Sequence, residues 1–265
     1  MDILFWYKLG LSFLIGGAWV TISTLAAEKF GSIVGGILAG FPSTVAVALF
    51  FIGFTQSEMV ASEATTVVPM THGVNGIFLL IFILLINKGL IAALSVSFLI
   101  WFSNAFILSS IGIHNFGISL LVWLIFFLSA FLLIEKVIKI NKQGKLTLHY
   151  SKWQIVVRAL FGGGVIAFAV LIGKLSGPTL GGIFATFPAM FVSTLVVTHL
   201  SGGAQFSRAV AKSMLFSGLI NVTLYVIVIR YLYLWIGLGW GTLIALVIAL
   251  YIGYLTFYVM KTKLS

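Results

Sequence analysis

The chain has 265 residues, of which 61% are hydrophobic and 8% are charged, with a net charge of +10 and no cysteine. This composition excludes a soluble domain and predicts an all-α polytopic membrane protein, because apolar runs longer than a bilayer-crossing segment recur along the chain. Without cysteine there are no disulfides or thiolate metal sites, and the four histidines lack ligand spacing, so we expect no metal and no cofactor. The positive charge does not indicate nucleic acid as a partner, because its largest cluster lies in one loop between apolar spans.

Segments of about 20 apolar residues, the length that crosses a bilayer, predict nine transmembrane helices. The chain opens with Asp2 rather than a basic cluster and shows no small-residue cleavage site, so we expect the first segment to be retained as a span. The predicted helices are residues 3–25, 31–54, 63–87, 89–110, 114–137, 153–175, 177–200, 207–231 and 238–260.

The sequence repeats itself at an offset of 146 residues. GSIVGGILAGFP at 31–42 corresponds to GPTLGGIFATFP at 177–188, and an ungapped alignment of 16–76 with 162–222 contains 12 identities in 61 positions. Helices one to four pair with six to nine, and the fifth is a connector. Because an odd number of spans separates the copies, they must be inverted, a 4+1+4 arrangement. We expect a first repeat in 1–112, a linking helix and basic loop in 113–152, and a second repeat in 153–265.

Positive charge predicts the orientation of these spans in the cell membrane. The linking loop is rich in lysine and should face the cytoplasm, which places the N-terminus outside and the C-terminus inside. Other basic residues then fall mostly inside. The loop carries Lys136, Lys139, Lys142, Lys145 and Lys152; Lys29, Lys88, Arg208, Lys212, Lys261 and Lys263 also lie inside, and Lys8, Lys174 and Arg230 lie outside with Glu58 and Glu63.

A proline lies near the middle of the second and of the seventh predicted helix. Pro42 and Pro188 lack the N–H that continues a helix, so both helices should be interrupted near the bilayer midplane, and the carbonyls of Leu38 and Phe184 should lose their regular partners. Glycine pairs precede both prolines and permit close packing or local unwinding. One interpretation is a packing kink. The other is a site between the repeats, because paired broken helices are typical of transporters.

Polar side chains accompany both breaks. Asn75 and Asn221 are equivalent in the repeat, and each amide can coordinate a polar solute or bond to carbonyls that the prolines free. His72 is replaced by Gly218 in the second copy; it is a candidate proton acceptor or gate, or a packing histidine. The candidate solute-binding residues are Pro42, Ser43, Thr44, His72, Asn75, Phe187, Pro188 and Asn221.

Three basic residues are candidates for attracting anions at the cytoplasmic mouth. Arg158 starts the sixth predicted helix, and Arg208 and Lys212 share a face of the eighth. The alternative role is that of topology and headgroup anchors, which positive residues on that side commonly fill.

The segment with Arg158, the glycines at 162–164, Phe187-Pro188 and Arg208 resembles the GlpM-like family of small inner-membrane proteins. The resemblance implies a four-helix unit with a basic residue near its start, a small-residue stretch, a Phe-Pro pair in the second helix and charged residues opening the third. The first copy keeps Phe41-Pro42, but its Lys8 is one turn out of register. The resemblance implies an antiparallel pair of units, here fused, and no particular activity.

These features together predict a membrane transporter or channel for a small polar or anionic solute. The alternative is a lipid scramblase or flippase, in which basic residues hold a lipid phosphate beside a lateral groove. An enzyme is not expected, because the five acidic residues are terminal or near loops and no catalytic constellation is evident. The expected partners are the lipid bilayer and the solute, and a homo-oligomer is compatible with the sequence.

Overall fold

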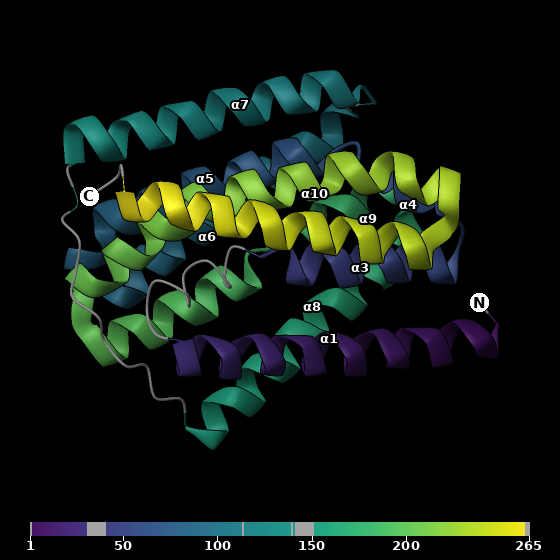
Figure 1. Ribbon diagram of the computed structural model, residues 1–265, viewed down its shortest axis with the longest axis horizontal. Coiled ribbons are helices and arrows are strands. Elements are labelled where there is room, and N and C mark those ends of the chain that lie inside the picture. Colours follow the sequence, from purple (N-terminus) through teal and green to yellow (C-terminus); the bar gives the residue numbers. More distant parts are fainter. Residues whose placement is uncertain (1, 31–40, 113, 139, 141–150, 263–265) are drawn as a thin grey trace.

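The computed structural model describes residues 2–30, 41–112, 114–138, 140 and 151–262. Among these residues every regular element is helical (Figure 1). In chain order the elements are α1 (Ile3–Phe30), α3 (Ser43–Thr55), α4 (Glu58–Ala64), α5 (Val68–Leu85), the 3-10 turn η1 (Ile86–Lys88), α6 (Leu90–Ile111), α7 (Phe116–Leu132), the π-helical η2 (Leu133–Ile138), α8 (Lys152–Ser176), α9 (Pro178–Ala185) and α10 (Ala189–Thr262).

Two glycines divide α10 into three helical segments. Gly203 has φ 74° and Gly237 has φ 80°, values that favour glycine because a Cβ would clash there. The chain therefore turns at both positions, and we call the parts the first (189–202), second (204–236) and third (238–262) segments of α10. The second and third segments lie close to the last two predicted spans, 207–231 and 238–260. The span expected at 177–200 is instead α9 followed by the first segment, with a break at 186–188 between them.

Several predicted helices agree closely with the structure, and one does not. The segments expected at 89–110 and 153–175 are α6 and α8. The segment expected at 63–87 is α5 with η1, a stretch that starts only at Val68, because the chain leaves α4 at Ala64 and turns at residues 65–67. The first half of the second predicted helix, including Leu38 and the glycine pair before Pro42, lies outside the described residues.

The outer surface of the helices is apolar, as a membrane environment requires. Six helical stretches of the described chain are long and apolar enough to cross a bilayer, the last of them running through α9 and α10. Only 22% of the most apolar window of α6 and of α7 is buried, so their remaining apolar side chains face outward. Ile91 (82% exposed) and Phe106 (73%) of α6 are examples, and Trp235 (77%) of α10 is exposed in the same way. Such a surface would be strongly unfavourable in water and suits lipid.

Helix α5 is the centre of the bundle. Of its most apolar window 78% is buried, against 22% to 33% for the other candidate spans. It packs against α6, α7 and α10, and its Phe78 and Phe82 are fully buried. One apolar cluster is built around α5, and a second joins α3 to α8 and to the later segments of α10. The central cavity described below lies between these two clusters, which share the helix break after α9.

Helices α1 and α8, which are equivalent in the repeat, pack on one another through reciprocal glycine contacts. A methyl group added to Gly17 would stand 3.1 Å from the carbonyl oxygen of Ala159, and one added to Gly163 would stand 2.5 Å from that of Phe13. At the repeat offset, Ala159 corresponds to position 13 and Gly163 to position 17. Each contact is therefore the counterpart of the other with the two copies exchanged. The same holds for Gly16 with Ile166 and for Gly162 with Val20.

Candidate functional site

Both Phe-Pro pairs end in the same local structure, from which a new helix starts. Helix α9 stops at Ala185, and α10 starts directly after Pro188, as α3 starts directly after Pro42. The N–H of Ser43 donates to the Phe41 carbonyl and that of Ala189 donates to the Phe187 carbonyl, both at 2.7 Å. These bonds form a tight turn around each proline. The interruption predicted at Phe187-Pro188 is thus present, and the helix beyond Pro42 begins in the equivalent way.

The proline does not leave the Phe184 carbonyl without a partner. The N–H of Phe187 donates to it at 3.1 Å, in place of the N–H that Pro188 lacks. The glycines before this break serve close packing: Gly181 lies against Gly173 of α8, and Gly182 lies against the backbone of Ala64. The packing interpretation of the glycines therefore applies to the second copy.

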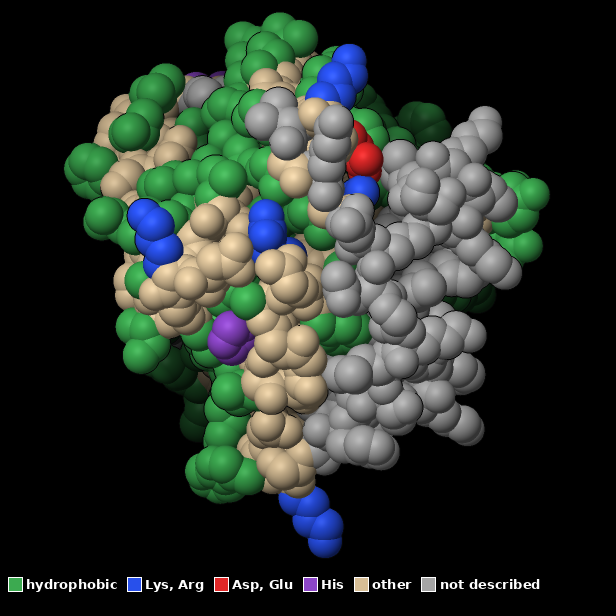
Figure 2. Space-filling model, turned by 90° about the vertical axis from the view of Figure 1, so that its left-hand side faces the viewer, with side chains coloured by type: hydrophobic (Ala, Val, Ile, Leu, Met, Phe, Trp, Pro, Cys, Tyr) green, Lys and Arg blue, Asp and Glu red, His purple; other side chains and the backbone are tan. Residues whose placement is uncertain are grey.

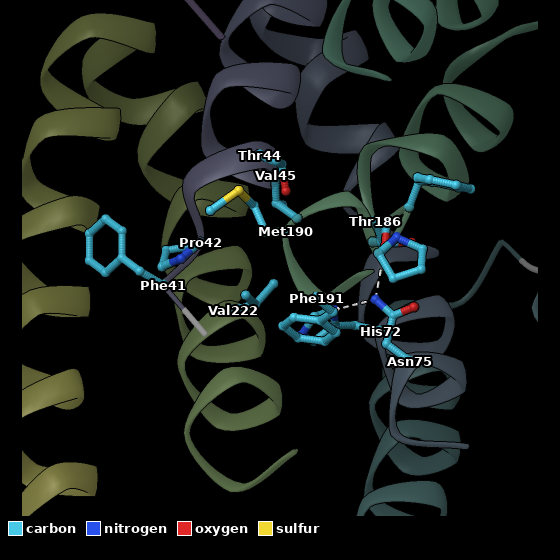
Figure 3. Close-up of a pocket in the computed structure, with 12 residues that line it drawn as sticks. Phe41, Pro42, Thr44, Val45, His72, Asn75, Thr186, Met190, Phe191 and Val222 are labelled. Atoms are coloured by element: carbon cyan, nitrogen blue, oxygen red, sulfur yellow. Dashed lines mark hydrogen bonds between the residues drawn. The ribbon is translucent and has the colours of Figure 1, made fainter. Parts of the chain in front are cut away.

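The two Phe-Pro pairs line one small cavity (Figure 3). Its volume is about 20 Å³, enough for one water molecule. Four pairs of equivalent positions contribute to the wall, together with His72, Asn75, Thr186 and Val222. The pairs are Phe41 with Phe187, Pro42 with Pro188, Thr44 with Met190 and Val45 with Phe191.

Asn75 is the centre of a complete hydrogen-bond network on one side of this cavity. Its amide nitrogen donates to the Thr186 carbonyl (2.8 Å) and to His72 Nδ1 (3.1 Å). Its amide oxygen accepts a hydrogen bond from Trp101 Nε1 (2.8 Å). Thr186 lies inside the helix break, so Asn75 binds a carbonyl that has no helical partner. Of the two roles predicted for Asn75, this geometry supports the repair of the broken helix.

His72 connects the two copies at their equivalent positions. Its Nδ1 accepts from Asn75, which assigns the proton to Nε2, and Nε2 donates to the Gly218 carbonyl at 3.2 Å. His72 and Gly218 are 146 residues apart, the offset of the repeat. With both ring nitrogens bonded and the side chain 3% exposed, His72 has the arrangement of a packing histidine rather than of a free proton acceptor.

Asn221 and Ser43, predicted with this site, are buried but do not line the cavity. Asn221 is 0% exposed, and neither atom of its amide has a hydrogen-bond partner among the described residues. It lies one turn after Gly218 and directly before Val222, which does line the cavity. The Ser43 hydroxyl also lacks a partner in this part of the chain, as does Nε1 of Trp19, whose ring stacks on Phe41. Among the described residues, the polar groups of Ser43 and Trp19 beside Phe41-Pro42 are therefore unused, whereas the Thr186 carbonyl in the break before Pro188 is bonded.

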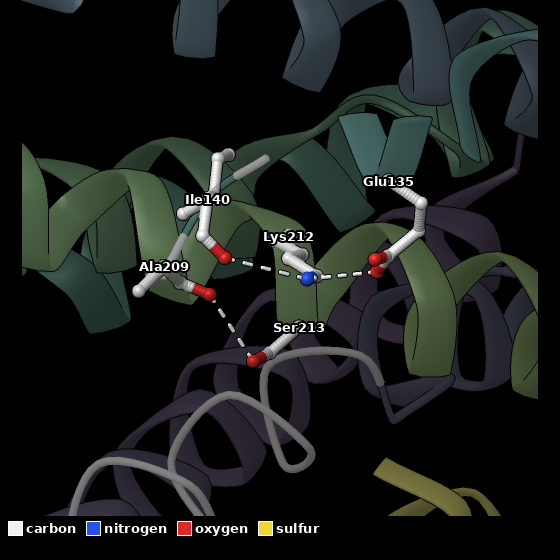
Figure 4. Close-up of polar contacts among 5 residues, drawn as sticks. All are labelled: Glu135, Ile140, Ala209, Lys212 and Ser213. Carbon is white, nitrogen blue, oxygen red and sulfur yellow. Dashed lines mark hydrogen bonds and ion pairs between the residues drawn. The ribbon is translucent and has the colours of Figure 1, made fainter. Parts of the chain in front are cut away.

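None of the three basic residues lines the cavity, and each has a polar partner of its own. Arg158 is 5% exposed and donates to Thr194 Oγ1 (3.2 Å), and Arg208 Nη1 is 3.4 Å from Gln205 Oε1. Lys212 forms an ion pair with Glu135 at 2.7 Å (Figure 4). Figure 2, which views the end where α7 finishes, shows Lys and Arg side chains scattered among neutral ones.

Sequence reasoning missed Trp101, Thr186 and Glu135. Trp101 is 1% exposed in α6, where an apolar span gives no sign of a polar partner. Thr186 takes part through its backbone carbonyl, which no side-chain pattern marks. Glu135 was grouped with loop residues, yet it neutralises Lys212 from η2. Of these three residues, only Trp101 could have been found from the sequence, by a search for polar side-chain atoms in otherwise apolar spans.

Comparison with known proteins identifies the family and leaves the activity undefined. No curated protein and no solved structure matches the chain. One family, described as a protein of unknown function (DUF3147), matches residues 9–114 and again residues 155–262. The two matches start 155 − 9 = 146 residues apart, which is the offset of the repeat and fits an internal duplication. The chain therefore belongs to the DUF3147 family and carries the family's domain twice.

Proposed function

We propose that the chain is a membrane transporter or channel that passes a small polar solute through the cavity between its two copies. The observation that carries this proposal is the cavity wall, which four pairs of equivalent residues form around the break at Phe187-Pro188 and the helix start after Pro42. Helix breaks at the interface of inverted repeats are where transporters commonly bind their substrates. The small volume corresponds to a closed state, and the helices must separate to admit anything larger than water.

The proposed architecture has nine spans in two inverted four-helix repeats joined by α7, with helices two and seven broken. Two observations support a pseudo-twofold axis between the copies. The contacts of α1 with α8 are reciprocal, as an isologous interface requires, and His72 meets the residue equivalent to itself. Helix α1 begins and α10 finishes at opposite ends of the bundle, as an odd number of spans requires (Figure 1). We propose further that each copy corresponds to one GlpM-like unit.

The site favours an uncharged solute over an anion. No Lys, Arg, Asp or Glu lines the cavity among the described residues, and the sequence of 31–40 contains none. Bringing an ion there would incur a desolvation cost that no opposite charge offsets. The unused amide of Asn221 and hydroxyl of Ser43 offer both donors and acceptors at the first break, which suit a neutral hydrogen-bonding solute.

Lipid transfer is the second candidate, and the geometry gives it less support. A lipid headgroup needs a polar path that opens sideways to the bilayer. A hollow on the side of the bundle, between α1, α3 and the third segment of α10, has an apolar lining, and Lys212 is already paired with Glu135. The basic residues proposed to hold a phosphate therefore do not meet a polar groove in the described part of the chain.

Transport should depend on Asn221 and not on a similar asparagine elsewhere. In liposomes, uptake of urea, glycerol or formamide followed by light scattering should exceed that of protein-free vesicles, while chloride and nitrate should not permeate. Asn221→Leu should reduce the flux by about tenfold or more, the effect of one lost hydrogen bond of usual strength. The matched control is Asn104→Leu, since among the described residues Asn104 bonds only to its own helix at Ile100.

The outcomes of this assay separate the solute class from the function. Permeation of the anions alone would contradict the proposal that the solute is uncharged but would support the proposal that the chain is a transporter or channel. No flux of any of these solutes, or full flux in a folded Asn221→Leu variant, would contradict the proposed site. Exchange of fluorescent lipid between leaflets that needs the protein would support the scramblase instead.

Labelling of single cysteines should confirm the proposed orientation. The chain has no native cysteine, so introduced thiols report one position each. Gln143 lies in the basic linking loop, and Met59 of α4 is 62% exposed. We expect a membrane-impermeant maleimide added to intact cells to react with Met59→Cys and not with Gln143→Cys, and inside-out vesicles to give the opposite result. Reaction of both from one side would exclude the inverted arrangement.

A further inference from the structure

A second hollow opens on the side of the bundle, separate from the polar cavity. It lies between α1, α3 and the third segment of α10 and has a volume of about 210 Å³. Its lining is formed by Ile15, Trp19, Ala46, Val47, Phe50, Phe51, Thr242 and Leu246, and no polar surface is exposed within it. The hydroxyl of Thr242 is used by Tyr233 (2.9 Å). A dry apolar cavity of about 150 Å³ is already large enough to take up benzene. We call this hollow the lateral groove.

The rim of the lateral groove is apolar too, which indicates that lipid covers it. Leu14 on α1 is 65% exposed, and Leu243 and Val247 on the third segment of α10 are 53% and 60% exposed. Protein–protein interfaces normally have a polar rim around an apolar core, whereas the three rim residues named here are all apolar. The groove therefore faces hydrocarbon.

The level of the groove selects the tail of a lipid. Trp19 lines the groove, and its ring stacks on Phe41 with a centroid separation of 6.4 Å. Phe41 directly precedes Pro42, near the middle of the second proposed span. Only acyl chains reach that depth of a bilayer, because headgroups stay at its surfaces.

Trp19 and Phe41 also form the wall between the groove and the polar cavity. Phe41 belongs to the lining of the cavity and Trp19 to that of the groove. In Figure 3 the ring of Phe41 points away from His72 and Asn75, toward the outside of the site. We propose that the lateral groove binds one acyl chain of a membrane lipid, and that this chain holds Trp19 against Phe41 and closes the cavity on its lipid side.

Photolabelling tests this binding site without any transport assay. The full chain in phosphatidylcholine nanodiscs is irradiated with a fatty acid that carries a diazirine in mid-chain, and adducts are mapped by mass spectrometry. We expect adducts near Ile15 and Leu246 that saturate with dose and are displaced by oleate. Val47→Phe fills the groove and should reduce them about tenfold, as expected for loss of about two buried methylene groups. Val96→Phe, the same change on lipid-facing α6, should leave them unchanged.

A second variant covers the case in which Val47→Phe does not fold. Ile15 is 42% exposed at the mouth of the groove, so Ile15→Trp obstructs entry without overpacking the interior. Labelling that rises without saturation, or that equals the labelling around Val96, would show that the groove has only non-specific contact with lipid and would contradict the proposed binding site. Unchanged labelling in folded Val47→Phe and Ile15→Trp would also overturn the proposal. A disulfide between two copies through Leu243→Cys would show that a second chain, not lipid, covers the groove.

Discussion

Replacing Asn75 by leucine should destabilise the protein by about 3–5 kcal/mol, because each buried polar group left unpaired costs about 1–3 kcal/mol. The variant would strand the Trp101 indole N–H, the Thr186 carbonyl and His72 Nδ1 at once. The same substitution at the equivalent Asn221 removes an amide that has no partner among the described residues. Asn221→Leu should lower the stability by less than about 1 kcal/mol, or raise it, because an apolar side chain then replaces a buried amide that has no hydrogen bond.

Unfolding in mixed micelles of increasing SDS content, followed by circular dichroism, measures this difference. Asn104→Leu provides the reference for an asparagine that bonds to its own helix. Trp101→Phe should recover part of the loss in the Asn75→Leu background, because it removes one of the stranded donors. Equal destabilisation at Asn75 and Asn221 would show that the different hydrogen bonding of the two asparagines is not a property of the protein.

The sequence predicted the pairing of the two asparagines but not their different surroundings. The alignment already showed that His72 has no counterpart, since Gly218 replaces it. Trp101 lies beyond the aligned segment, and the position 146 residues later is Val247, which has no donor. The expectation that both amides share one polar site therefore rested on the symmetric part of the repeat, whereas hydrogen bonding here depends on residues outside it.

Local patterns predicted the long helices and the second break well. The limits of α6 and α8 follow from apolar runs bounded by glycine or serine. The break between the end of α9 and the start of α10 at Ala189 follows from the missing N–H of Pro188. The turn between α4 and α5 was not predicted, because residues 63–87 read as one apolar run. Its stabilising partner is distant: Arg230 Nη1 donates to the Ser62 carbonyl and to the hydroxyls of Thr65 and Thr66. Contacts across more than 160 residues leave no trace in a local pattern.

The packing of the two copies gives a second large effect. Gly163→Ala should destabilise the protein by about 1–3 kcal/mol, the usual cost of overpacking, because the new methyl group would stand 2.5 Å from the Phe13 carbonyl oxygen. A backbone atom cannot move aside as a side chain can, so α1 and α8 must separate. Next to it on the same helix, Gly164→Ala meets nothing within 4 Å and should stabilise α8 by about 0.5–1 kcal/mol, because alanine loses less backbone entropy than glycine in a helix.

The reciprocal contact predicts a graded result on α1. Gly17→Ala places its methyl group 3.1 Å from the Ala159 carbonyl oxygen, a less severe overlap than at Gly163, and should destabilise the protein less. Gly10, where an added methyl group meets nothing within 4 Å, is the matched control on α1. Because both clashes lie in one interface, the double variant Gly17→Ala with Gly163→Ala should cost less than the sum of the single changes: once α1 and α8 have separated, the second methyl group finds room. Strictly additive losses, or equal losses at Gly163 and Gly164, would show that α1 and α8 do not meet through these glycines.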